Sequence, residues 1–166
     1  MEQTEAIKRT EAFLRAQLGV DVHFRPGGPE WSQLSLPPAP DAEYSFEIHV
    51  YADGEPQICA RLINHDASRY FWYHPFEVPD FGSVDARDKG FFEALELLVT
   101  RPSRIRQSKG LFLCRFVCEV LDNGQWRRVG PGMGALTFTN FKLPPGRKRT
   151  YSSPASRGRG STGPAA

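Results

Sequence analysis

The stretch YSFEIHVYADGEPQICARLI, residues 44–63, decides the fold class. Apolar residues occupy every second position from Tyr44 to Val50, which is typical of a β-strand with one buried face. Asp53-Gly54 follows, and this dipeptide favours the tight turn of a β-hairpin. Residues 57–63 then alternate again. The stretch therefore predicts two antiparallel strands that share one core-facing side.

The regions on either side of this hairpin extend the pattern. An aromatic run from Tyr70 to His74 predicts a third antiparallel strand, ended by Pro75. Apolar residues recur with helical spacing in two segments, 4–18 and 86–100. Further strands are predicted at 110–121, 125–129 and 135–141. We expect an α+β fold, with an antiparallel sheet of about five strands and both helices packed on one face.

The chain of 166 residues is long enough for one domain, which we expect at residues 1–142. A Pro- and Gly-rich loop is expected within it, at residues 25–43. Residues 143–166 are rich in Pro, Gly, Ser and Arg, so we expect a disordered basic tail. Residues 1–142 hold sixteen Lys and Arg against nineteen acidic residues, whereas the tail holds five Lys and Arg and no acid. The basic balance therefore belongs to the tail, and the body is mildly acidic.

Several function classes lack support in the sequence. The three cysteines are an odd count without a CxxC spacing, and the first residues form no apolar leader, so we expect a reduced protein in the cytoplasm. No apolar run approaches the length of a membrane span, so we expect no membrane partner. No phosphate-binding loop, nucleophile elbow, zinc-protease motif or EF-hand is present. We therefore expect no cofactor, and we favour a non-catalytic role over an enzyme.

The favoured hypothesis is a binding protein that presents an aromatic-rich sheet face to a protein partner or to a second copy of itself. Tyr, Trp and Arg are enriched at protein interfaces. Residues 25–43 could instead cover this face. The element order is similar to that of small secretion chaperones and immunity-type α+β binding proteins, a similarity of topology that carries no residues over. The residues expected on the face are Glu47, His49, Tyr51, Arg61, Trp72 and His74.

Two alternatives use other residues. A small enzyme or a metal site is possible if His49, Cys59 and His74 converge across the sheet. A nucleic-acid-binding accessory protein is possible through a basic loop at 101–109 together with the tail. The mildly acidic body argues against the second alternative. The cations that would serve it are Arg101, Arg104, Arg106, Lys109, Arg127 and Arg128.

Overall fold

A computed structural model shows an α+β fold and describes residues 2–19, 21–63, 70–109, 114–129, 136–137 and 148–154. The two long helices are α1 (Gln3–Leu18) and α3 (Val84–Thr100), and one short helix, α2 (Val78–Phe81), precedes α3. The strands are β1 (Arg25–Gly28), β2 (Trp31–Ser35), β3 (Tyr44–Tyr51), β4 (Pro56–Leu62), β5 (Tyr70–Pro75), β6 (Ser103–Lys109), β7 (Cys114–Asp122), β8 (Gln125–Arg128), β9 (Leu136–Thr137) and β10 (Lys148–Ser153).

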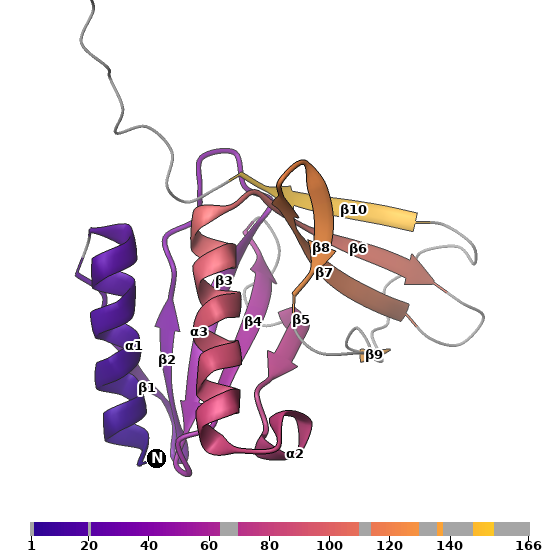
Figure 1. Cartoon of the computed structure of the whole chain (residues 1–166). Coiled ribbons are helices and arrows are strands. Elements are labelled where there is room, and N and C mark those ends of the chain that lie inside the picture. Colours follow the sequence, from indigo (N-terminus) through magenta and orange to yellow (C-terminus); the bar gives the residue numbers. More distant parts are fainter. Residues whose placement is uncertain are drawn as a thin grey trace, which may run out of the picture.

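The first sheet has five antiparallel strands in the order β1-β2-β3-β4-β5. Helices α1 and α3 lie side by side on one face of it (Figure 1). The alternating apolar side chains of β3 point to that face, and Ile48 and Val50 are fully buried there with Leu14 of α1 and Leu95 of α3. The predicted α+β class, five-stranded antiparallel sheet and pair of helices on one face are confirmed.

A second sheet, which the sequence did not predict, follows the helices. Its strands run β10-β6-β7-β8, with β9 paired to β7. The strand expected at 110–121 is β7, and it belongs to this second sheet rather than to the first. One face of the second sheet carries buried Ile105, Phe116, Val120 and Tyr151, which join the same core as the first sheet. Two sheets and two helices therefore enclose one core.

Three segments expected to be irregular contain strands. The Pro- and Gly-rich loop supplies β1 and β2, which extend the first sheet at its edge instead of lying across its face. The expected basic loop at 101–109 is mostly strand β6. The expected disordered tail supplies β10, which pairs with β6 along its whole length, so disorder is wrong for Lys148–Ser153. The rest of that tail, residues 143–147 and 155–166, lies outside the described residues.

Hydrogen bonds join the two sheets where β3 begins. The hydroxyls of Tyr44 and Ser103 are 2.7 Å apart in the core. The backbone N–H of Glu43 donates to the carbonyl oxygen of Ser152, and the N–H of Ser152 donates to the Glu43 carboxylate at 2.7 Å. Strand β10 is thus bonded to both sheets, and a domain boundary at residue 142 would cut through the folded body. Among the described helices, none has the length and apolar character needed to cross a membrane.

Candidate functional site

The face of the first sheet that points away from the helices carries most of the residues expected there. Register places Glu47 opposite Cys59 and His49 opposite Gln57, so these side chains share the outer face with Tyr51 and Arg61. Strand β5 departs from the expectation. Its Trp72 and His74 pair with Ala60 and Ile58, which point to the helices, and Tyr73 takes the outer position opposite Cys59. Trp72 is therefore a core residue and His74 lies half-buried on the helix side, and the expectation that they line the binding face is wrong.

The three candidate catalytic or metal-binding residues do not converge. His74 lies on the helix side of the sheet, stacked on Trp72 and against the edge of Phe76, while His49 and Cys59 lie on the outer side. Burial lowers the pKa of His74, and nearby Asp80 offsets this only in part. Among the described residues, no group of three or more His, Cys, Asp or Glu side chains is arranged to hold a metal ion. The site built on all three residues is thus ruled out by the sheet register.

His49 and Cys59 do meet. The Cys59 Sγ lies 3.6 Å from His49 Nδ1, and the Glu47 carboxylate lies 3.6 Å from His49 Nε2. All three side chains are buried. Burial, with a smaller contribution from the charge of Glu47, raises the pKa of Cys59 to about 12. At neutral pH this residue is therefore a thiol, whereas a nucleophilic cysteine needs its thiolate.

Glu47 is the centre of a buried polar network on the outer face of the first sheet. Arg61 lies 3.0 Å from its carboxylate, and the Ser35 hydroxyl donates to it at 3.2 Å. Because a buried carboxylate needs such partners, the network holds β2, β3 and β4 in register at this level. The network thus orders the outer face at this level, where Cys59 is itself only 2% exposed.

Trp31 covers one end of this network. Its ring lies 4.3 Å from the His49 ring, centroid to centroid. The other side of the indole lies directly on the backbone of Gly27, where a β-carbon would overlap the ring. Any larger residue at position 27 would displace the Trp31 ring, so glycine at this position of β1 lets the indole pack on the backbone. Within residues 31–35, the side chain of Trp31 shares the outer face with Gln33 and Ser35.

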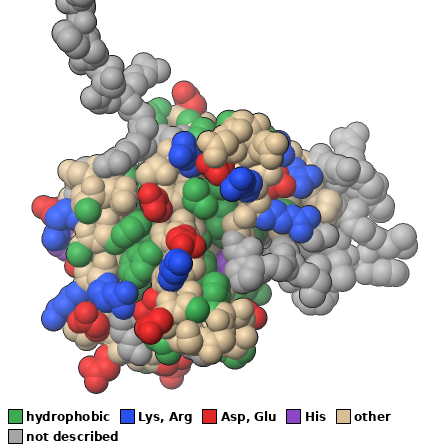
Figure 2. All heavy atoms as spheres, viewed as in Figure 1, with side chains coloured by type: hydrophobic (Ala, Val, Ile, Leu, Met, Phe, Trp, Pro, Cys, Tyr) green, Lys and Arg blue, Asp and Glu red, His purple; other side chains and the backbone are tan. Residues whose placement is uncertain are grey.

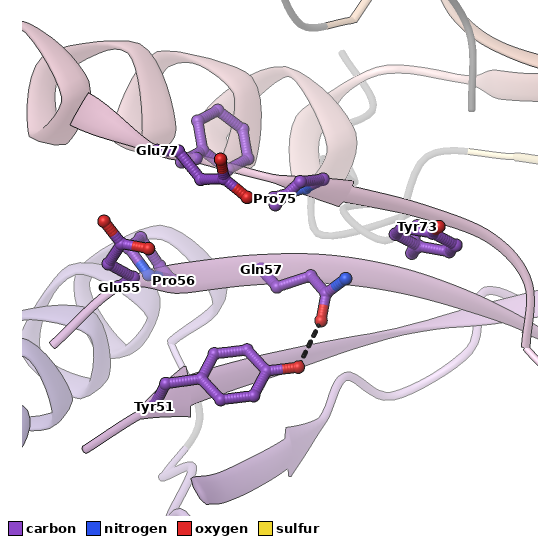
Figure 3. A pocket seen from close by; sticks show the side chains of 8 residues that line it. Tyr51, Glu55, Pro56, Gln57, Tyr73, Pro75 and Glu77 are labelled. Atoms are coloured by element: carbon purple, nitrogen blue, oxygen red, sulfur yellow. Dashed lines mark hydrogen bonds between the residues drawn. The ribbon is translucent and has the colours of Figure 1, made fainter. Parts of the chain in front are cut away.

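Beyond this cover, the outer face has a shallow hollow of about 200 Å3 at the ends of β3, β4 and β5 (Figure 3). Two tyrosines flank it, and both are exposed, Tyr51 by 37% and Tyr73 by 38%. The Tyr51 hydroxyl donates to the Gln57 side-chain oxygen at 2.8 Å, which fixes one ring. Figure 3 shows the carboxylates of Glu55 and Glu77 at the end of the hollow away from Tyr73. Prolines and a buried ring complete the lining, from Pro56, Pro75 and Phe76.

A buried arginine, Arg87, lies behind the acidic end of the hollow and positions Glu55. Arg87 of α3 is only 2% exposed, and it bonds Asp88 at 2.8 Å and lies 4.0 Å from the Glu55 carboxylate. Arg9 of α1 in turn bonds Asp88 at 2.9 Å. This chain of ion pairs links both helices to the turn that carries Glu55. The Glu55 carboxylate is thereby positioned at the rim, and among the described residues no Lys or Arg lines the hollow itself.

The second sheet carries the other candidate residues. On its outer face, Arg104 and Arg106 both bond the Glu119 carboxylate, at 2.8 Å and 2.6 Å. The Arg104 guanidinium also lies 4.0 Å above the Trp126 ring. At the neighbouring end, Arg101 and Arg127 flank Asp122, at 3.9 Å and 3.2 Å. Arg128 pairs with Glu119 in the strand register, and Lys109 ends β6 opposite Cys114.

Sequence reasoning missed two exposed aromatic residues of these sites, Tyr73 and Trp126, as well as the carboxylates of Glu55, Glu77 and Glu119. Tyr73 stands in an unbroken aromatic run, where no alternation shows which rings face outward. Trp126 follows the Asn123-Gly124 turn, and a single exposed aromatic after a turn gives no signal until its neighbour strand is known. Its contact with Arg104 depends on the register of β6 with β7 and of β7 with β8, which the sequence does not show.

Comparison with protein-family models found no match, and the curated proteins and the solved structures likewise yielded none at a significant level. The functional argument therefore rests on side-chain chemistry and on the geometry of the two sheets.

Proposed function

We propose that this chain is a non-catalytic binding protein that docks an extended basic segment of a partner protein on the outer face of its first sheet. The observation that carries the proposal is the hollow between Tyr51 and Tyr73, with Glu55 and Glu77 at one end. Exposed tyrosines supply rigid contact area at a small cost in side-chain entropy. The Glu77 carboxylate favours a positive charge beside it, while the Glu55 carboxylate lies 4.0 Å from Arg87.

The size of the hollow supports a side chain rather than a metabolite. Its volume of about 200 Å3 is below the roughly 300–1,000 Å3 of typical small-molecule sites. An Arg or Lys side chain could stack its stem on a tyrosine ring and place its cation near the Glu77 carboxylate. The prolines beneath would contact apolar or proline residues on either side. The buried Cys59 and the separated histidines give no comparable support to an enzyme.

The partner could be another protein or a second copy of this chain, and the proposal commits to another protein. Docking in the cytoplasm agrees with the odd number of cysteines and with the thiols of Cys59 and Cys118, which are free and buried. A contact centred on one side chain predicts modest affinity, in the micromolar range typical of small interfaces.

Selection from a library of displayed random peptides tests the proposal. We expect the full chain to enrich peptides with one Arg or Lys next to proline or an aromatic residue. The substitutions Tyr73→Ala and Glu77→Gln should each weaken a selected peptide about tenfold. Trp126→Ala is the matched control, since it removes an equally exposed aromatic from the other sheet and should leave peptide binding unchanged.

Sedimentation of the purified chain supplies the second measurement. A monomer that binds the selected peptide supports the proposal. A dimer that Tyr73→Ala dissociates would show that the occupant is a second copy, and peptide binding that is indifferent to Tyr73 and Glu77 would remove the hollow from the function altogether.

A further inference from the structure

The fold places cations from distant parts of the sequence on one surface. Strand β6 contributes Arg104 and Arg106, and β8 contributes Arg128. These residues share the outer face of the second sheet with Glu119 and Trp126, because side chains two residues apart point the same way. In Figure 2, blue Lys and Arg side chains gather where the second sheet reaches the surface. The core of this sheet lies on its opposite face.

Two guanidinium groups are held in place there by one acid. Arg104 donates once to Glu119 and Arg106 donates twice, at 2.6–2.8 Å. Each guanidinium has five N–H donors, so Glu119 takes a minority of them. Burial raises the pKa of Glu119, but the hydrogen bonds and charges of both arginines outweigh it and hold that pKa below its usual value. The carboxylate therefore stays ionised at neutral pH and keeps the two cations ordered.

An exposed indole lies within this cationic group. Trp126 is 38% exposed, and the Arg104 guanidinium lies 4.0 Å from its centroid. Arg128 is exposed on the same edge strand and the same face, whereas Arg127 points to the opposite face and pairs with Asp122. On β10, which is the other edge strand and pairs with β6, Thr150 and Ser152 are exposed on the same face as Arg104. An exposed aromatic ring next to a guanidinium group, on a face that also carries further guanidinium groups and hydroxyls, is the composition of a surface that stacks bases and binds phosphates.

We propose that the outer face of the second sheet binds single-stranded nucleic acid, with a base stacked on Trp126 and phosphates held by Arg104, Arg106 and Arg128. A duplex keeps its bases stacked on one another and offers no free base face to the indole. An acidic peptide would use the cations and leave the ring without a flat partner. This site is separate from the hollow on the first sheet and does not rest on the function proposed there.

Fluorescence anisotropy with a labelled single-stranded oligonucleotide, an unstructured oligo(dT) of about fifteen nucleotides, tests the proposal on the full chain. Three phosphate contacts predict a logarithmic salt slope of roughly −2, since each contributes about −0.7 on a single strand. Trp126→Ala should weaken binding about tenfold, and Trp126→Phe should restore much of it because a ring remains. Arg106→Gln should weaken binding and make the salt slope shallower.

Tyr73→Ala is the matched control and should bind the oligonucleotide as the parent chain does, while thermal melts confirm that each variant is folded. Deletion of residues 155–166 removes Arg157 and Arg159 and should leave the effect of Trp126→Ala intact. Three results would overturn the proposal: no binding at low salt, equal binding of a duplex, or binding that depends on the deleted segment and not on Trp126.

Discussion

Tyr151 tests whether the C-terminal strand is part of the folded body. Its side chain is only 1% exposed, its hydroxyl donates to Gln107 at 3.3 Å, and Arg149 lies over its ring. The change Tyr151→Ala removes roughly 120 Å2 of buried ring surface, which at about 25 cal/mol/Å2 corresponds to ~3 kcal/mol of unfolding free energy. For a chain of this size, that loss lowers the melting temperature by roughly 6–12 °C.

Urea unfolding and thermal melts followed by circular dichroism measure the loss. Deletion of residues 148–166 should cost at least as much, because β6 then loses its partner strand as well. Two controls should change stability far less: deletion of residues 155–166, and Tyr73→Ala, which removes a ring that is 38% exposed. A melting temperature for Tyr151→Ala within about 1 °C of the parent would refute the docking of β10 and restore a domain boundary near residue 142.

Other parts of the structure lead to three further predictions. Gly27→Ala should lower the unfolding free energy by about 1–3 kcal/mol in urea titrations, since a β-carbon overlaps the Trp31 ring; an unchanged midpoint would contradict the close approach. Because burial lowers the pKa of His74, the unfolded chain takes up a proton that the folded chain resists, so His74 makes stability fall as pH drops below about 6.5. His74→Phe should flatten that decline between about pH 7 and pH 5, and an unaltered profile would mean that His74 is solvated. Cys59 should resist iodoacetamide at pH 8 in the native chain, as read by peptide mass mapping, because its thiol is buried and its pKa is about 12; rapid native labelling would revive a nucleophilic role.

The sequence was sufficient to predict a helix or strand wherever apolar residues recurred without interruption at helical or alternating spacing. Both long helices lie within two residues of the expected bounds. An apolar stripe with helical spacing can be buried on one side only if the segment is a helix. The alternation of Tyr44–Tyr51 likewise predicted β3 residue by residue. The turn at Asp53-Gly54 was predicted because this dipeptide tolerates positive φ, and Gly54 adopts a positive φ in the structure.

Strands β6 and β10 escaped because their inward positions are partly polar. Ser103 and Gln107 point into the core from β6 and are buried, which a hydrophobicity pattern cannot indicate. Each is satisfied by a tyrosine hydroxyl from a distant segment, Ser103 by Tyr44 and Gln107 by Tyr151. Neither strand is identifiable alone, since the partner that makes its burial favourable is more than forty residues away.

The candidate sites likewise contain residues that local sequence patterns predicted and residues that only the pairing of distant strands brought together. The sequence by itself determined the outer face of β3 and β4, with Glu47, His49 and Cys59, because their alternation leaves one arrangement with a buried core. The tertiary structure alone decided that Tyr73 faces outward in β5, because an all-aromatic run fits either register and a shift between Ala60 and Arg61 selects one. It alone also gathered Arg104, Trp126 and β10 on one sheet, since contacts between strands far apart in sequence depend on pairing that no local period encodes.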